Sequence, residues 1–344
     1  MPGLGRSGAR AQLMASWQTR VDGHVLEAAW SPSADRAAVI SVEGELTVLD
    51  RQGGTPLWSC RAHTHGGSST DWHPALAVIA TGGHDGAARL WNAADGTLLH
   101  TLEAGSTWVE RVAFSPDGQL VATAAGRAVR LWNLQGTLVR EYAKHRATVT
   151  DLRWQPGRAR LCTTSYGGVT VFDPAQEQPE QTFSWQGSSL TARWSPNGKY
   201  IATGDQDSTV HFWITKTGRD LMMSGYPGKV RELSWDSASR YLATGGSQEL
   251  AVWDCSGAGP RGTTPIILSG HEAWLTAVAF QHSGTRLMSG DESGKVYLWQ
   301  LTARDPLVAA ADLSHGVSLL LWTPDDRAVL VGGATGEVRL LRMP

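Results

Sequence analysis

Cysteine is scarce in this chain of 344 residues, long apolar runs are missing, and neither sign of charge is in marked excess. The three cysteines, Cys60, Cys162 and Cys255, are too few and too scattered for a disulfide framework, so we expect a reducing, cytoplasmic compartment. No apolar run approaches the roughly 18 residues of a membrane span, and the N-terminus lacks the apolar stretch of a secretory signal. A net charge of −2 gives no field that favours nucleic acid or an acidic membrane, so neither is expected as a partner.

The elements of the common catalytic sites are also missing. No glycine-rich loop opens a helix to hold a phosphate, because no segment shows a helical period of useful length. There is no GxSxG motif and no serine, histidine and aspartate set at a recognisable spacing, although a set assembled only by folding would escape this test. Arginine outnumbers lysine 25 to 5, which we attribute to coding bias rather than to an arginine patch. We therefore expect no cofactor and no enzymatic activity.

What the chain does contain is one pattern repeated eight times. An apolar run ends in an aromatic residue and a turn, at Trp30, Trp72, Phe114, Trp154, Trp194, Trp235, Phe280 and Trp322. A second phrase follows each copy: LTVLD, ARLWN, VRLWN, VTVFD, VHFWI, LAVWD, VYLWQ and VRLLR. The spacing of 40 to 45 residues indicates a repeat architecture in which each unit needs its neighbours to bury its faces.

Each repeat reads as four short strands. Residues 55–91 alternate β-rich segments with turn residues, and Asp117-Gly118 and Asn197-Gly198 are typical hairpin turns. We predict an all-β fold, a single closed propeller over residues 14–344, with eight blades favoured and seven as the less expected count. The last repeat stops at its third strand, so residues 15–21 are expected to complete its blade. Residues 1–13 are expected to form a disordered tail.

The repeats resemble those of the WD40-repeat family. They end in Trp91-Asn92, Trp132-Asn133 and Trp253-Asp254, and SGHEAWLTAVAF at 269–280 looks like the family's Gly-His opening. The resemblance covers residues 14–344. It implies a non-catalytic scaffold that is monomeric alone and binds a protein or peptide partner on one face of the propeller.

The resemblance also implies a hydrogen-bonded tetrad in each blade, made by a histidine, a serine or threonine, an aspartate and the tryptophan of the second phrase. The second repeat supplies the full set His63, Thr81, Asp85 and Trp91. The seventh supplies His271, Ser289 and Trp299, with Ser293 at the acidic position. The fifth supplies Thr203, Asp207 and Trp213, with Trp185 in place of the histidine. We expect these groups to be structural, because truncating one member of a buried network leaves its partner unpaired.

An alternative function is the handling of a metal or small ligand, in the Cys60/His63/His65 loop or in the central channel. A sulfur and imidazoles suit zinc. Two observations weigh against a metal site: the tetrad already uses His63, and no paired CxxC or HxxxH supports the cluster.

Partner-binding residues are expected on the rim formed by the loops that enter each blade and the turns between its second and third strands. Aligning the repeats places seven candidates there: His84, Trp108, Glu110, Lys229, Arg231, Trp274 and Glu292. The sixth and seventh repeats are neighbours, so Lys229, Arg231 and Trp274 should form one basic-aromatic patch suited to an acidic or aromatic peptide segment. The alternative is that these are ordinary solvated loops.

Overall fold

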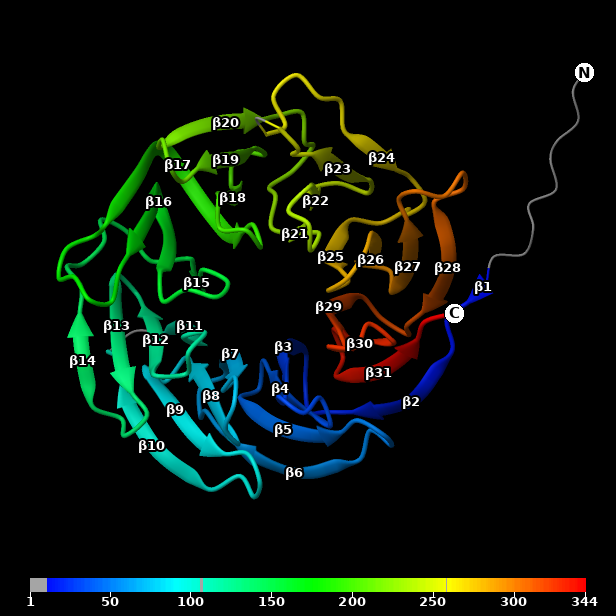
Figure 1. Cartoon of the computed structure of the whole chain (residues 1–344). Helices are drawn as coiled ribbons and strands as arrows, with labels where there is room; N and C mark the ends of the chain where they lie inside the picture. The colour runs from blue at the N-terminus through cyan, green and yellow to red at the C-terminus, as the bar shows by residue number, and fades with distance from the viewer. Residues whose placement is uncertain (1–10, 106–107, 258) are drawn as a thin grey trace, which may run out of the picture.

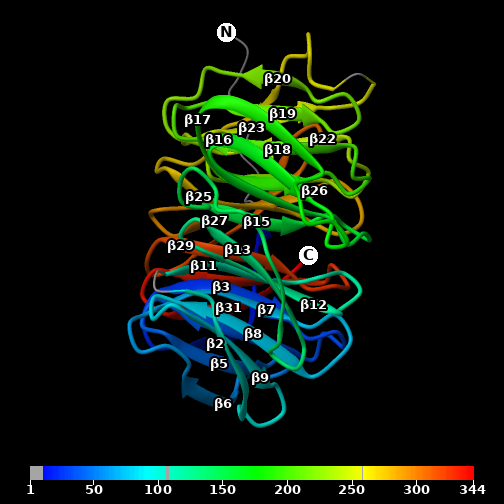
Figure 2. The same ribbon diagram turned by 90° about the vertical axis from the view of Figure 1, so that its left-hand side faces the viewer.

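The computed structural model describes residues 11–105, 108–257 and 259–344, and every regular element in these ranges is a β-strand. The strands form a closed ring around a central opening (Figure 1), and the ring is thinner from face to face than it is wide (Figure 2). No helix in the described ranges is long and apolar enough to cross a membrane.

The strands follow the eight repeats in chain order. The first three repeats contain β3 (Val25–Trp30), β4 (Arg36–Ser41), β5 (Glu45–Asp50), β6 (Pro56–Arg61), β7 (Gly67–Trp72), β8 (Val78–Gly83), β9 (Ala87–Asn92), β10 (Leu98–Glu103), β11 (Val109–Phe114), β12 (Leu120–Ala125), β13 (Ala128–Asn133) and β14 (Leu138–Glu141). The fourth and fifth contain β15 (Asp151–Trp154), β16 (Leu161–Phe172), β17 (Gln181–Trp194), β18 (Tyr200–Asp205), β19 (Val210–Ile214) and β20 (Arg219–Met223). The last three contain β21 (Leu233–Trp235), β22 (Tyr241–Thr244), β23 (Leu250–Asp254), β24 (Ile266–Leu268), β25 (Leu275–Phe280), β26 (Arg286–Asp291), β27 (Lys295–Gln300), β28 (Leu307–Asp312), β29 (Val317–Trp322), β30 (Ala328–Gly333) and β31 (Glu337–Arg342). Two strands precede the first repeat: β1 (Ala11–Gln12) and β2 (Ala15–Arg20).

Hydrogen bonding among the described residues divides the ring into seven sheets rather than the eight that were favoured. The difference lies in one six-stranded sheet, β15 to β20, which holds the fourth and fifth repeats together. The first part of β17 pairs with β16, and its last part, from Ser189 to Trp194, pairs with β18. One long strand therefore serves as the outer strand of one repeat and the inner strand of the next.

Strand β16 similarly contains two strands of the fourth repeat. Its first part pairs with β15 and its last part with β17, and the Thr163 hydroxyl donates to the Thr170 carbonyl across the turn between them. Gly167 and Gly168 at this turn have φ of 104° and 114°. A Cβ on Gly168 would overlap the Phe183 carbonyl oxygen, so this turn requires glycine. The first seven repeats thus contribute four strand segments each, and the eighth contributes three.

The apolar core is divided among the contacts between neighbouring repeats. The described residues form eight clusters of buried side chains, and each cluster draws on two successive repeats, the last and first included. Successive side chains of a strand point to opposite faces of its sheet, so a middle strand such as β12 contributes buried residues to both neighbouring interfaces. An outer strand such as β10 buries few residues. A repeat cut from the ring would expose two apolar faces, which explains why the fold needs closure.

The N-terminal strand closes the ring as predicted. Strand β2 pairs antiparallel with β31 and becomes the outer strand of the last sheet, beside the C-terminus in Figure 1. The expected tail boundary at residue 13 is wrong, because β1 pairs in parallel with β28 and Leu13 is buried in the cluster between the seventh and eighth repeats. Residues 1–10 of the expected tail lie outside the described residues.

Indole N–H groups join neighbouring repeats at the inner strands. Trp154, Trp194, Trp235 and Trp322 each donate to an inner-strand carbonyl of the preceding repeat, at 3.1, 3.1, 3.3 and 2.9 Å. Trp17 and Trp58, on outer strands, donate in the other direction, to the Arg51 and Ala93 carbonyls of the following repeat. At four positions the repeated aromatic therefore combines an apolar ring between sheets with a directional bond across the interface, whereas the indole nitrogens of Trp30 and Trp72 have no partner among the described residues.

The tetrad of the second repeat is assembled around His63. Its Nδ1 lies 2.9 Å from Asp85, its Nε2 lies 2.9 Å from the Thr81 hydroxyl, and the Trp91 indole donates to the same hydroxyl at 2.9 Å. Arg89 also donates to Asp85 at 2.8 Å. Partial burial opposes the charge of Asp85, but hydrogen bonds and charges from His63 and Arg89 lower its pKa to about 2.

The seventh repeat contains a full tetrad as well, which corrects the assignment of Ser293 to the acidic position. His271 bonds Asp291 at 2.6 Å and Ser289 at 2.7 Å, and Trp299 donates to Ser289 at 2.7 Å. Ser293 instead donates to Asp291 at 2.7 Å. The acidic residue can therefore lie two positions after the strand hydroxyl rather than four, because the turn between strands can present either position to the histidine.

The fifth repeat shows the same shift without the histidine. Asp205, not the predicted Asp207, lies in the interior, where one carboxylate oxygen and the Trp213 indole have no hydrogen-bond partner among the described residues. Burial raises the pKa of Asp205 to about 7. Trp185 occupies the histidine position and packs on His211 with ring centroids 4.2 Å apart.

Two other repeats substitute for parts of the tetrad. In the sixth, the Tyr226 hydroxyl takes the place of the histidine, since it contacts the Thr244 hydroxyl at 2.9 Å and accepts the Trp253 indole at 2.9 Å. In the fourth, His145 contacts Thr163 at 3.2 Å. Neither repeat therefore contains the full four-residue tetrad.

Closure predicts a contrast between two adjacent residues of the N-terminal segment. Leu13→Ala should lower the free energy of unfolding by about 2–4 kcal/mol because it leaves a cavity between two repeats, whereas Met14→Ala, an exposed position, should change it by less than about 0.5 kcal/mol. Deletion through Arg20 should promote aggregation, because it uncovers the edge of β31. Urea denaturation of both variants measures the contrast, and equal midpoints would contradict the role of Leu13.

The corrected tetrad predicts which carboxylates matter. Asp85→Ala and Asp291→Ala should each cost about 3–5 kcal/mol, because each leaves a buried histidine without its partner, and Ser293→Ala about 1 kcal/mol or less. Chemical denaturation near neutral pH compares the three variants. A loss for Ser293→Ala as large as that for Asp291→Ala would mean that the seventh-repeat network is wrongly assigned.

The raised pKa of Asp205 predicts a pH dependence of stability. From about pH 4 to about pH 7 the folded state holds a proton that the unfolded chain releases, so the free energy of unfolding should fall as pH rises through this interval. Asp205→Asn should flatten the profile and gain on the order of 1–2 kcal/mol at about pH 7.5, whereas Asp291→Asn should lose stability there. Thermal unfolding at several pH values tests this, and an unchanged slope in Asp205→Asn would refute it.

Candidate functional site

The loops entering each repeat and the turns between its second and third strands lie on one face of the ring. The backbone N–H of His84 donates to the Gly66 carbonyl, and that of Glu292 donates to the Trp274 carbonyl, both at 2.9 Å. These bonds tie each entry loop to the turn beside it. Six of the seven residues predicted to bind a partner lie in these two classes of segment, and the seventh, Glu110, is the second residue of β11 beside the entry loop.

The Trp274 depression lies between the sixth and seventh repeats. Lys229, Arg231, Trp274 and Glu292 line a hollow of about 570 Å³ together with Glu232. The Trp274 ring rests against Gly228, where a Cβ would approach its carbons to 2.6 Å, and 40% of the residue stays exposed. Burial raises the pKa of Glu232, whose carboxylate accepts the Gly246 N–H.

Lys229, Arg231 and Trp274 line one hollow, but the charge of this surface differs from the one expected. Two cations and two carboxylates line the Trp274 depression, so it is a mixed-charge aromatic site rather than the basic-aromatic patch expected from the sequence. Trp274 also borders a second hollow of about 430 Å³ with Ser247, Gln248 and Glu249. The indole therefore forms a ridge between two polar hollows.

The channel-mouth cavity lies beside the Trp274 depression and shares Arg231 with it. It has a volume of about 490 Å³, and its walls include His84 and Glu110, two more of the predicted residues. Trp108 stacks on His84 with ring centroids 4.2 Å apart and is 56% exposed. The cavity is also lined by two arginines and four hydroxyl-bearing residues: Arg111, Arg193, Ser68, Thr148, Thr150 and Thr191.

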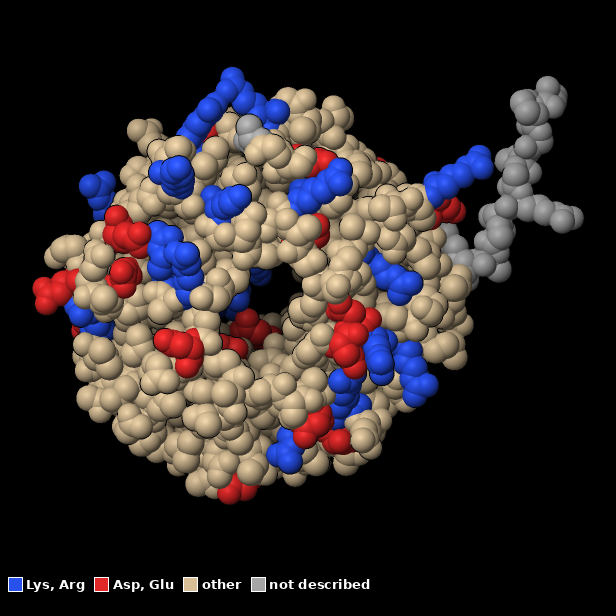
Figure 3. Space-filling view, viewed as in Figure 1, with Lys and Arg blue, Asp and Glu red and all other residues tan. Residues whose placement is uncertain are grey.

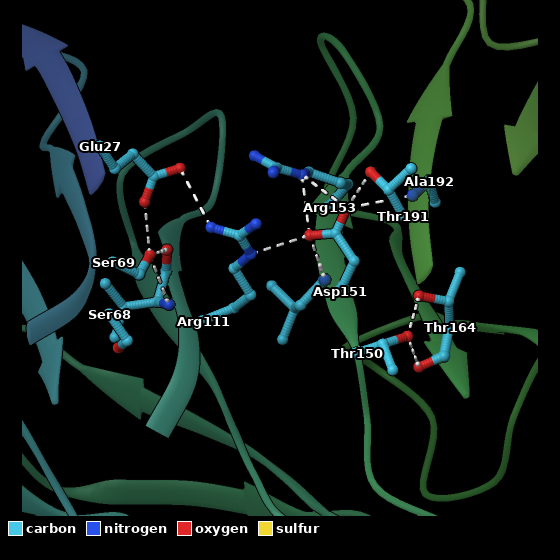
Figure 4. A network of polar contacts seen from close by, with 12 residues as sticks. Glu27, Ser68, Ser69, Arg111, Thr150, Asp151, Arg153, Thr164, Thr191 and Ala192 are labelled. Atoms are coloured by element: carbon cyan, nitrogen blue, oxygen red, sulfur yellow. Dashed lines mark hydrogen bonds and ion pairs between the residues drawn. The ribbon is translucent and has the colours of Figure 1, made fainter. Parts of the chain in front are cut away.

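Asp151, at the start of the inner strand β15, is the centre of a charge network on the channel wall (Figure 4). Its fully buried carboxylate contacts the guanidinium groups of Arg111, Arg153 and Arg193 at 3.1 to 3.2 Å and accepts the Thr191 hydroxyl at 3.0 Å. Burial works against the carboxylate, but the three guanidinium groups hold its pKa well below its usual range. Three guanidinium groups thus surround the single negative charge of Asp151.

Glu27 and Asp71 supply the other carboxylates of this wall. Figure 4 shows Arg111 between Glu27 on one side and Asp151 on the other, and its Nη1 lies 3.4 Å from Glu27. Glu27 also accepts the Ser69 hydroxyl at 2.7 Å. Asp71 accepts the Phe114 N–H at 2.8 Å, and burial raises its pKa to about 7. Asp71 is therefore only partly ionised near neutral pH.

Sequence reasoning missed these channel residues, although the repeats contain a signal for them. The positions three and one before the repeated aromatic face the channel and hold the charged residues Glu27, Asp71, Arg111, Asp151, Arg153 and Arg193 in the first five repeats. The same positions hold alanine or leucine in the seventh and eighth. One side of the channel is therefore charged, and Figure 3 shows side chains of both signs on the walls of its opening.

The metal alternative finds little support in the geometry. Cys60 lies on the outer strand β6, where burial raises the pKa of its thiol to about 11 and so disfavours the thiolate that binds metals. Both ring nitrogens of His63 are engaged in the tetrad. Within residues 11–105, 108–257 and 259–344, no group of three or more histidine, cysteine, aspartate or glutamate side chains is placed to hold a metal ion.

Two family models match the chain. A model described as the first β-propeller of IFT122 matches residues 78–342, and a model of the WD40 domain of anaphase-promoting complex subunit 4 matches residues 28–117. Among solved structures, the computationally designed Ika8 protein superposes with a TM-score of 0.82, covering 96% of this chain and 99% of its own, at 20% identity. That structural likeness concerns the fold alone.

Curated relatives share the repeats within larger proteins. Telomerase protein component 1 of Rattus norvegicus is 27% identical over 70% of this chain, which spans 9% of that protein. Pre-mRNA-processing factor 19 of Oryza sativa subsp. japonica is 27% identical over 80% of this chain. Pre-mRNA-processing factor 19 homolog 2 of Arabidopsis thaliana is 30% identical over 78% of this chain. This chain spans about half the length of each of these two proteins. Because one family model spans more than half of the chain and these relatives share its repeats, the chain belongs to the WD40-repeat β-propeller family.

Proposed function

We propose that this propeller is a non-catalytic scaffold that binds a peptide segment of a protein partner across Trp274. The WD-repeat relatives support a protein-interaction role in general, and the particular surface is inferred from this chain. We further propose that it acts in the cytoplasm as a monomer, a reducing setting that suits its three unpaired thiols.

The observation that carries the proposal is the exposed Trp274 ridge between two hollows. A rigid indole supported from below by Gly228 offers a large apolar contact at little cost in side-chain entropy. Lys229 and Arg231 border the hollow on one side, and Gln248 and Glu249 border the one on the other. A peptide lying across the ridge would therefore place an acidic side chain over Lys229 and Arg231 and a polar or basic one over Glu249.

The geometry of the site does not support a catalytic or a metal-binding function. Asp151 and its arginines are engaged with one another, and the tetrad histidines His63 and His271 are held by their hydrogen bonds, although His271 also borders the hollow of about 430 Å³ beside Trp274. Their arrangement supports a structural role.

The rim proposal predicts that Trp274→Ala weakens partner binding about 5- to 150-fold, equivalent to about 1–3 kcal/mol, while the melting temperature stays within about 1 °C of wild type. Partners are first recovered from the native host with the wild-type chain and identified by mass spectrometry. Their affinities for purified wild type and Trp274→Ala are then measured by calorimetry.

Tyr166→Ala is the matched control, because Tyr166 is an exposed aromatic that lines a separate hollow on the fourth repeat. It should bind the partner as wild type does. Binding that survives Trp274→Ala but is lost in Tyr166→Ala would move the interface to the fourth repeat and overturn the proposal.

A further inference from the structure

A hollow on the fourth repeat, which we call the Tyr166 hollow, has no part in the proposed function. Its volume of about 790 Å³ lies within the roughly 300–1,000 Å³ typical of small-molecule sites. The loop that enters the fourth repeat, the turn within β16 and the first part of β17 line it, on the side of the ring where Figure 1 shows these two strands. Strand β14, which precedes the loop, has only four residues, and Thr182 and Ser184 on β17 remain exposed.

The charge of the Tyr166 hollow is unbalanced. Lys144 and Arg146 line it and are both exposed, whereas none of its lining residues is an aspartate or a glutamate. Burial lowers the pKa of His145 between them, so this imidazole is neutral near pH 7 and adds no charge. Four other hollows of the described structure each contain at least one carboxylate. The Tyr166 hollow therefore favours an anionic ligand.

The neighbouring carboxylates do not neutralise these two cations. Glu141 and Glu180 are bound by Arg130 and Arg160, at 3.1 and 2.7 Å. Glu177 precedes a lining residue but does not itself line the hollow. No ion pair among the described residues includes either lining cation, so an anion can bind both without displacing a carboxylate of the protein.

The large apolar side chains of the lining are aromatic. Tyr166, Phe172 and Trp185 contribute them, and no leucine, isoleucine, valine or methionine lines the hollow. Tyr166 is 54% exposed. The Trp185 ring is held in place, because it packs on His211 and lies where a Cβ on Gly187 would overlap it. The hollow thus offers flat rings rather than the aliphatic pocket that would anchor a leucine or valine of a peptide.

Neutral polar groups complete the lining. Four hydroxyl groups and two side-chain amides are present: Ser165, Thr170, Thr182, Ser184, Gln178 and Gln186. Both glutamines are exposed. A side-chain amide donates and accepts hydrogen bonds, which matches the alternating donors and acceptors on the edge of a heteroaromatic ring. The groups present therefore suit a planar polar ring that carries a negative charge.

We propose that the Tyr166 hollow binds a single nucleotide, with its base stacked on the Tyr166 ring and its phosphate bound by Lys144 and Arg146. Every base has a π-face, so an exposed aromatic ring accepts any of them, and lysine and arginine both bind phosphate. A bare inorganic anion would leave the aromatic lining unused. The nucleotide is a second ligand, independent of the peptide proposed for Trp274, because no residue lines both this hollow and those beside Trp274.

The test uses defined probes with the full chain. Calorimetry at low ionic strength and about pH 7.5 compares adenosine monophosphate, adenosine and inorganic phosphate. Adenosine monophosphate should bind with a Kd below about 1 mM. Adenosine and phosphate should each bind at least about tenfold more weakly, because each keeps only one of the two contacts. Guanosine and cytidine monophosphates should bind within about tenfold of adenosine monophosphate, since stacking tolerates every base.

Variants of exposed residues locate the site. Tyr166→Ala should weaken binding of adenosine monophosphate about tenfold, whereas Tyr166→Phe, which keeps the ring, should stay within about twofold of wild type. Arg146→Gln should weaken it about fivefold through loss of a charged donor. Arg158→Gln is the matched control, an exposed arginine of the same repeat that does not line the hollow, and should leave binding unchanged. Melting temperatures confirm that each variant is folded.

Four outcomes would overturn the proposal: no binding of adenosine monophosphate to wild type, equal affinity for adenosine, equal affinity for inorganic phosphate, or equal affinities of the Arg146 and Arg158 variants. The third would indicate a site for a free anion. Failure here is separable from failure of the rim proposal. Trp274→Ala should leave nucleotide binding intact, because Trp274 does not line the Tyr166 hollow.

Discussion

The structure depends on the contact that the repeated aromatic makes with the preceding repeat. At Trp154, Trp194, Trp235 and Trp322 the indole ring fills the space between sheets and its N–H donates to a carbonyl about one repeat earlier in the chain. Apolar packing alone would allow neighbouring sheets to slide, whereas the directional bond at these four interfaces fixes their register. At the other four positions, Trp30, Trp72, Phe114 and Phe280, the contact is packing without such a bond among the described residues.

Closure converts a periodic sequence into a site that no single repeat contains. Inner-strand positions one or two repeats apart become neighbours on the channel wall, which is how Arg111 contacts both Asp151 of the next repeat and Glu27, 84 residues earlier in the chain. The charges lie on one side of the channel because the first six repeats carry them, with Glu232 in the sixth, whereas the seventh and eighth hold alanine or leucine at the same positions. The Trp274 ridge arises in the same way, from an entry loop of the seventh repeat lying against Gly228 of the sixth.

The fold could be predicted because its signals are local and are repeated many times. Turn residues, alternating strands and the recurring aromatic all lie within about forty residues of one another, and each copy reinforces the others. The register of His63, Thr81, Asp85 and Trp91 could be read in the same way. Single turns were harder: Asp291 and Asp205 were missed because a shift of two residues in a turn alters the sequence spacing while leaving the carboxylate in place.

The sequence by itself determined an all-β ring of WD40-type repeats, its closure by residues 15–20 and the rim on which the candidate binding residues lie. Only the tertiary structure decided that β17 joins two repeats in one sheet, that Glu232 and Glu292 balance the cations beside Trp274, and that three arginines share the carboxylate of Asp151. The reason is physical. Strand formation and repeat packing depend on short-range pattern, whereas the charge balance of a site depends on side chains that approach one another only when the ring is closed.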